Sequence, residues 1–195
     1  MLDRRDFLKH SMAVAAIAPA GVVTANVDAT AIAATRPRNG IRFVVVDEDF
    51  EDSVAFADEL IAHGAKVFSV QQDLGRLWFG ELGAAFSAGK SIAGLTSHSE
   101  FHICSSFARA HGASVRYEGE HDCRGSEILT HSILMNEEAP ILLSKIVAAD
   151  IHWPRALAAQ LAATSCSDTS CRETTQTQTR RSATHPGSLF SWMIA

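Results

Sequence analysis

The sequence lacks several features that would assign it to a protein class at once. It has only 4 cysteines in 195 residues, too few to build a disulfide scaffold. Its 17 Lys and Arg residues are outnumbered by 22 Asp and Glu residues, so it lacks the basic surface with which proteins bind nucleic acid. Its apolar runs are too short and too broken to predict a membrane span. Because acidic residues outnumber basic ones, we expect no nucleic-acid partner.

Short catalytic and cofactor motifs are also missing. The chain has no Gly-x-Gly-x-x-Gly turn, which disfavours classical dinucleotide binding. It has no Gly-x-Ser-x-Gly elbow and no Cys-x-x-Cys pair, which disfavours an α/β-hydrolase nucleophile and a thioredoxin-like role. Its 47% hydrophobic content does supply enough apolar side chains for one compact core.

The N-terminal residues have the pattern of an export signal. Residues 3–9 read Asp-Arg-Arg-Asp-Phe-Leu-Lys, an Ala-rich apolar stretch follows to about residue 24, and small residues alternate over residues 29–33. Residues 3–9 resemble the twin-arginine (Tat) signal, Ser/Thr-Arg-Arg-x-Phe-Leu-Lys, departing from it at Asp3. The alternatives are an amphipathic helix of a cytosolic protein and an uncleaved membrane anchor.

This resemblance implies a removable signal peptide over residues 1–34 and a periplasmic protein exported by the Tat translocase. The chain as a whole looks like the small, uncharacterised proteobacterial proteins that carry such signals. Because the twin-arginine route carries folded proteins, often loaded with a cofactor, the resemblance points to a metal, a flavin or a periplasmic oxidoreductase as partner. It identifies none of them. A membrane association is expected only if the signal stays uncleaved.

Residues 35–163 alternate between strand and helix patterns. A β-branched run over residues 41–46, a helical stripe that starts at Asp52-Ser53, and a short strand over residues 66–70 predict a β-α-β unit. Two more strands are expected, at residues 91–96 and 114–118. We predict a small three-layer α/β domain with a mostly parallel sheet, Rossmann-like or flavodoxin-like, of four to five strands with flanking helices.

The last thirty residues change character twice. Residues 164–188 are rich in Ser, Thr and Gln, which predicts a flexible loop, and Cys166 and Cys171 within it are candidates for a disulfide in an oxidising compartment. Residues 189–195 contain Phe190 and Trp192, and their bulk predicts a strand that returns to the sheet. The alternative is a mobile, sticky terminus.

Ligands of open α/β sheets lie beyond the carboxyl ends of the strands, and this rule selects three candidate segments. Asp47 opens an acidic cluster directly after the first strand, and Asp73 follows the second. Thr96 and Ser97 follow the third strand at a helix start, where free N–H groups would receive a carboxylate or phosphate. Each has a structural alternative, which is a solvated loop acid or a simple helix cap.

Histidines provide the remaining candidates. His98 and His102 are four residues apart on one predicted helix and would bind a transition metal if a third ligand joined them. His121 lies in a polar segment, residues 118–123, that we interpret either as a surface loop or as the source of an acid–base group.

Three functions remain open from the sequence, and whether the protein is an enzyme is one of the open questions. The leading hypothesis is a ligand-binding or accessory component beside a periplasmic redox enzyme. The second is a small hydrolase or isomerase with a carboxylate–His site, metal-assisted or not, in which Asp47, His98 and His121 converge with Thr96 and Ser97. The third is an interaction protein that docks through its C-terminal segment.

Overall fold

A computed structural model describes residues 40–124, 128–135, 139–164, 173–180 and 187–195. The predicted signal peptide and the Cys166–Cys171 pair lie outside the described residues. The described residues all belong to one compact unit, Pro37–Ala195. In the described residues we find no helix that is both long and apolar enough to cross a bilayer.

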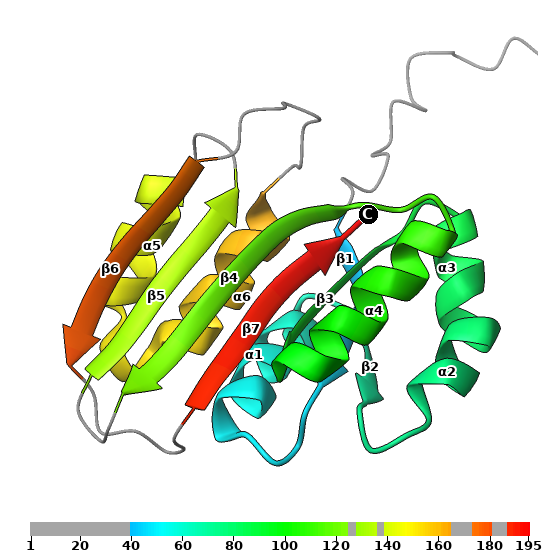
Figure 1. Cartoon of the computed structure of the whole chain (residues 1–195), viewed down its shortest axis with the longest axis horizontal. Coiled ribbons are helices and arrows are strands. Elements are labelled where there is room, and N and C mark those ends of the chain that lie inside the picture. The colour runs from blue at the N-terminus through cyan, green and yellow to red at the C-terminus, as the bar shows by residue number, and fades with distance from the viewer. Residues whose placement is uncertain (1–39, 125–127, 136–138, 165–172, 181–186) are drawn as a thin grey trace, which may run out of the picture. The chain divides into compact units, whose positions relative to one another are not determined.

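The described elements alternate between strand and helix in the first half of the chain (Figure 1). The strands are β1 Ile41–Val46, β2 Lys66–Ser69, β3 Ser91–Thr96, β4 Val115–Arg124, β5 Ile128–Met135, β6 Glu173–Arg180 and β7 Gly187–Ile194. The helices are α1 Glu51–Ala62, α2 Leu74–Leu77, α3 Gly83–Ser87, α4 His98–Ala110, α5 Ala139–Ala148 and α6 Trp153–Ala163, with a π-helical turn at Trp78–Leu82 and a 3₁₀ turn at Asp150–His152.

All seven described strands form one mixed sheet in the order β2-β1-β3-β7-β4-β5-β6. Only the pairs β1–β2 and β1–β3 are parallel, and the other four pairs are antiparallel. The predicted α/β class is confirmed. The predicted mostly parallel, Rossmann-like or flavodoxin-like sheet of four to five strands is wrong, because the second half of the chain adds antiparallel strands.

The parallel half, β2-β1-β3, follows directly from its sequence. β1 is paired on both sides and buries Val44, Val45 and Val46, as its continuous apolar run predicts. α1 begins at Glu51, one residue before the predicted start, with Phe50 as its N-cap. Its end is followed by Gly64, whose φ of 89° is the left-handed conformation that glycine adopts readily.

The antiparallel half, β4-β5-β6, was largely missed. Residues 118–123, one interpretation of which was a polar surface loop, lie inside β4, and β5 was not predicted at all. In β4 the residues Tyr117, Gly119, His121 and Cys123 alternate with acidic residues, so one face of the strand is buried and the other is polar. Alternation with polar side chains on both faces is a weak strand signal, which explains the misassignment.

The C-terminal residues form β7, which lies between β3 and β4 in the sheet. The interpretation of residues 164–188 as a flexible loop is wrong for residues 173–180, because these form the edge strand β6 and pair with β5. Docking through a free C-terminal segment loses its basis, because Leu189, Trp192 and Met193 are buried.

Helices cover the two faces of the sheet unequally (Figure 1). α1, α5 and α6 lie on one face and bury a large core with residues such as Phe56, Ile146 and Leu157. α2, α3 and α4 lie on the other face and pack on the parallel half and β7 through Trp78, Phe101 and a few more apolar residues. No described helix covers that second face over β4, β5 and β6, so the sheet has three layers in one half and two in the other.

Trp192 joins the two halves of the sheet. Its ring lies over Gly94 of β3, where an added Cβ would be only 2.4 Å from the indole Cζ2 atom. Its Nε1 donates a hydrogen bond to the Thr96 hydroxyl at 3.1 Å, and its ring lies 6.3 Å from that of Phe101 on α4. Gly94 is therefore required by packing, since any side chain there would displace the indole.

Candidate functional site

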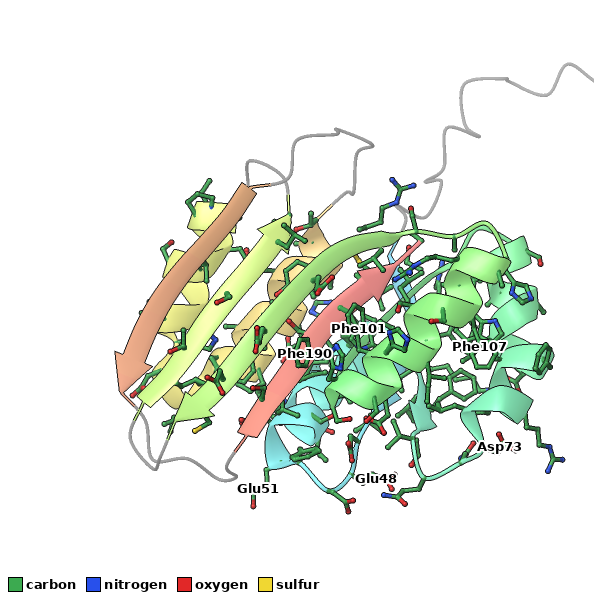
Figure 2. The ribbon with its side chains drawn as sticks, viewed as in Figure 1. Glu48, Glu51, Asp73, Phe101, Phe107 and Phe190 are labelled. Carbon is green, nitrogen blue, oxygen red and sulfur yellow. The ribbon has the colours of Figure 1, made fainter. Side chains whose placement is uncertain are left out.

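The carboxyl ends of β1 and β3 meet at one end of the parallel half. β1 continues into α1 on one face of the sheet, and β3 continues into α4 on the opposite face, which is the switch point where open α/β sheets bind ligands. Figure 2 shows Glu48, Glu51 and Asp73 at this end of the molecule. We call the group Asp47, Ser97 and Glu100 the switch-point cluster.

Asp47 is the most constrained carboxylate of the cluster. It is only 5% exposed, its amide N–H donates to the Ser53 hydroxyl at 2.9 Å, and its Oδ1 accepts from the Asp49 amide at 3.3 Å. Burial raises the pKa of Asp47, the hydrogen bond from Asp49 lowers it, and the negative charge of Glu100 raises it further. The fold therefore holds this acid in an environment that disfavours its charged form.

Ser97 caps α4 and contacts Glu100. Its Oγ accepts from the Ser99 amide at 3.2 Å, lies 2.8 Å from the Ser99 hydroxyl, and donates to the Glu100 carboxylate. The protein's own carboxylate therefore accepts from the hydroxyl that was predicted to receive a carboxylate or phosphate. Every charged neighbour that acts on Asp47 is also acidic, namely Glu100, Asp49 and Glu48.

Thr96 does not contribute a free hydroxyl. It is fully buried, accepts from the Trp192 indole and donates to the Ser97 carbonyl at 3.2 Å. Its hydroxyl therefore donates and accepts inside the protein, and Thr96 is not included in the cluster defined above.

Asp73 lies at the same end of the sheet but serves a local role. Its Oδ1 accepts from the Arg76 amide at 3.2 Å and caps the short helix α2. The loops after β1 and β2 are joined instead by Gln71, whose Nε2 donates to Asp49 at 3.3 Å. Asp73 therefore stands at the margin of the cluster, with its cap bond already formed.

His98 and His102 share one exposed face of α4, as their spacing predicts. Their ring centroids are 6.2 Å apart, and His98 also lies edge-on to Phe190, 4.8 Å away. No group of three or more potential metal ligands occurs among the described residues. The pair alone would give a metal two ligands, fewer than the four-coordinate sites that zinc prefers.

His121 does not converge with His98. His98 contacts Phe190 on the face of the sheet that carries α4, whereas His121 packs against Trp153 of α6 on the opposite face. The sheet itself therefore separates the two histidines. The hypothesis of one pocket lined by Asp47, His98 and His121 is not supported by this arrangement, since acid–base groups must reach one substrate.

A second polar group, which sequence reasoning missed, surrounds His121. His121 Nε2 lies 2.7 Å from the Ser191 hydroxyl, and His121 Nδ1 lies 2.7 Å from Nδ1 of His131. The Tyr117 hydroxyl lies 2.9 Å from Ser191 Oγ. All four side chains are at most 1% exposed. We call Tyr117, His121, His131 and Ser191 the buried histidine network.

The described cysteines are not reactive groups. Cys104 is buried on α4, where burial and then the charge of Glu100 raise the pKa of its thiol to about 12. Since only the thiolate is nucleophilic, this cysteine acts as a small core residue. Cys123 is buried against the large core under α6.

Two signals in the sequence could have identified the missed residues. Ser97 and Glu100 form the Ser-x-x-Glu pattern of a capping box, which predicts that both side chains turn back over the first turn of the helix. Tyr117, Gly119, His121 and Cys123 follow the two-residue period of a strand, which predicts one shared face.

Comparison with known proteins gives no assignment. No family model matches the chain, and neither the curated proteins nor the solved structures contain a match.

Proposed function

We propose that this chain is an exported, periplasmic ligand-binding protein that serves as an accessory component beside a periplasmic redox enzyme. Its ligand would contact the switch-point cluster, Asp47, Ser97 and Glu100. The observation that carries the proposal is Asp47, a carboxylate held 5% exposed at the end of β1 although its surroundings disfavour its charge. Carboxylates with such perturbed surroundings cluster at functional sites.

The chemistry of the cluster favours a ligand that brings positive charge or hydrogen-bond donors. Two carboxylates and a hydroxyl offer acceptor atoms, and the charges acting on Asp47 are all negative. An ammonium, guanidinium or hydroxyl-rich ligand would relieve the repulsion between Asp47 and Glu100, whereas an anion would increase it.

Binding is favoured over catalysis by the positions of the histidines. A serine nucleophile needs a base within hydrogen-bond reach, and the described partners of Ser97 are Ser99 and Glu100. His121 lies on the opposite face of the sheet, and His98 turns toward Phe190.

Export is tested by changing the two arginines. The R4K/R5K double variant and the unchanged chain are expressed in a proteobacterium and fractionated. We expect the unchanged chain in the periplasm and the variant in the cytoplasm. Equal distribution of both chains would remove the basis for an export role. Metal analysis and a visible absorption spectrum of the periplasmic protein then test for a metal or flavin.

The ligand site is tested by thermal shift with amines, polyols, phosphate and carboxylates. We expect stabilisation by members of the first two classes, lost in Asp47→Asn and Ser97→Ala. Glu120→Gln is the matched control, because Glu120 is an exposed carboxylate on β4 that does not belong to the cluster. Stabilisation by phosphate, or an equal response of all variants, would contradict the proposed site.

A second candidate, a small hydrolase or isomerase, rests on the contact between Ser97 and Glu100. In this form of the hypothesis Glu100 takes the proton from Ser97, and Asp47 supplies a second acid–base group. Turnover of activated esters that disappears in both Ser97→Ala and Glu100→Gln would favour it over binding alone. Turnover that persists in Ser97→Ala would exclude Ser97 as the nucleophile.

A further inference from the structure

The buried histidine network is enclosed by the antiparallel half of the sheet and α6. His121, His131 and Ser191 come from three adjacent strands, β4, β5 and β7, and their side chains meet on the face toward the large core. Gly119 makes room for this meeting, because a Cβ at that position would lie 2.5 Å from the Tyr117 hydroxyl and 2.7 Å from Ser191 Oγ. Any side chain at position 119 would therefore displace members of the network.

The contact between the two imidazoles requires exactly one proton. A hydrogen bond between His121 Nδ1 and His131 Nδ1, at 2.7 Å, needs one nitrogen to donate and the other to accept. One added proton leaves this bond intact, because an imidazolium can donate to a neutral imidazole. When both rings are protonated, each Nδ1 carries a hydrogen, so two N–H donors face each other and no hydrogen bond can form. The two positively charged rings then repel each other and must move apart.

Among the described residues, the face that holds the network is largely apolar. The described titratable groups that share this face are Tyr117 and Cys123 on β4 and His131 on β5, and none is a carboxylate. The facing described residues of β7 are Leu189, Ser191 and Met193, and the buried residues of α5 and α6 are apolar apart from the indole of Trp153. Burial, and then the charge of His131, hold the pKa of His121 well below its usual range.

α6 is the element placed to respond. Its first residue, Trp153, covers the network, with its ring centroid 4.3 Å from that of His121 and 5.0 Å from that of His131. The Trp153 Nε1 atom is buried and finds no hydrogen-bond partner within the part of the chain that the structure describes. Trp153 is therefore held by ring packing alone at its polar edge, and an unpaired buried donor favours release into water.

We propose that the His121–His131 pair is an acid-operated latch: protonation of both rings breaks the contact between them, and α6 releases Trp153 from the sheet. This conformational device acts on the opposite face from the switch-point cluster and does not depend on the ligand-binding proposal. In neutral conditions the latch is closed and the large core is complete.

The direction of the pH effect follows from where the protons bind. The closed form keeps His121 neutral, and the open form lets both histidines protonate near their usual pKa of about 6.5. Closure is therefore fully favoured above that pH and is lost as the pH falls below it. Because the closed pair can carry one proton and the open form two, the opening equilibrium should increase up to about tenfold for each pH unit below it.

The test is hydrogen exchange of the full chain between pH 7.5 and pH 4.5, corrected for the intrinsic rates. We expect exchange in the peptide 153–163 to rise steeply with acid, while the peptide 98–110, from α4 on the other face, stays protected. His131→Asn keeps an acceptor near the Nδ1 position but removes the second ring, so a charged His121 can still donate to it and the exchange should rise less steeply with acid than in the unchanged chain. His63→Asn, at an exposed histidine of α1, should behave as the unchanged chain.

Two results would overturn the latch. One is equal acid-induced exchange in both peptides, and the other is an unchanged steepness in His131→Asn. If that variant fails to fold, ¹⁵N spectra of the histidine rings in the unchanged chain decide the question. The latch requires one protonated and one bare Nδ1 in the pair at pH 7.5, and double charging only where the peptide 153–163 opens. Two charged rings under a fully protected α6 would exclude it.

Discussion

The two halves of the sheet differ in where their polar groups lie. In the parallel half, helices cover both faces, the strands are apolar, and the polar cluster of Asp47, Ser97 and Glu100 stands at the strand ends. In the antiparallel half, helices cover one face only, and polar groups such as His121 lie inside that face and form hydrogen bonds with one another. The first half therefore carries its polar cluster at the strand ends, and the second carries its polar network inside the covered face of the sheet.

The largest loss of stability is expected at β7, which lies between the two halves of the sheet. Trp192→Ala should lower the free energy of unfolding by about 3–5 kcal/mol, because it empties a fully buried indole site and leaves the Thr96 hydroxyl without its donor. Urea unfolding measures the change. Phe79→Ala is the control, since that ring is 78% exposed and should cost less than about 0.5 kcal/mol. Equal losses would mean that the halves are not joined through Trp192.

The next effect tests the antiparallel half alone. Gly119→Ala should cost about 1–3 kcal/mol, because its Cβ would push Tyr117 and Ser191 out of the buried histidine network. Glu120→Gln, at the next residue but on the open face, should change stability by less than about 0.5 kcal/mol. A similar cost for both variants in thermal or urea unfolding would show that the two faces of β4 do not differ as described.

A smaller effect is expected in the parallel half. Ser97→Ala removes the N-cap of α4 and the contact with Glu100, and it should cost about 0.5–2 kcal/mol. Ser144→Ala in α5 is the matched control, because its hydroxyl donates to the Ile141 carbonyl within the helix. A cost in the control as large as in Ser97→Ala would mean that the cap is not what stabilises α4.

The smallest expected change is a gain in the free energy of unfolding, not a loss. Asp47→Asn should stabilise the chain at neutral pH, by roughly 0.5–1 kcal/mol, because it removes a buried charge and its repulsion from Glu100. Folding raises the pKa of Asp47 above 3.8, so the folded chain gains stability as falling pH protonates this acid. The advantage of the variant should therefore shrink in acid. A variant that is less stable than the unchanged chain at pH 7 would show that Asp47 has a structural role.

The parallel half could be predicted from the sequence because its signals are local. Val44, Val45 and Val46 report a buried strand without reference to any other segment, and Gly64 marks the end of the next helix. β5 and β6 carry mixed or polar residues, so their own sequences give weak strand signals, and among the described strands β6 pairs only with β5, which lies far from it in sequence.

The candidate site divides in the same way. Asp47 and Ser97 were found by a rule about strand ends, and Glu100 could have been found from its spacing to Ser97. The buried histidine network depends on the register of β4 against β5 and β7, which pairs His121 with His131 and Leu189. That register is set by tertiary pairing, so no local pattern indicates that His121 and Ser191 meet.

The central position of β7 has a consequence for how the chain folds. Trp192 meets Thr96 across 96 positions of sequence, and without β7 the strands β3 and β4 would each have an unpaired edge. Contacts between such distant segments close late and slowly, since a long loop must be ordered before they form. A chain cut short before Gly187 would therefore leave two half-sheets with exposed edges, prone to aggregation and proteolysis. Only a chain that extends through β7 can therefore form the complete sheet.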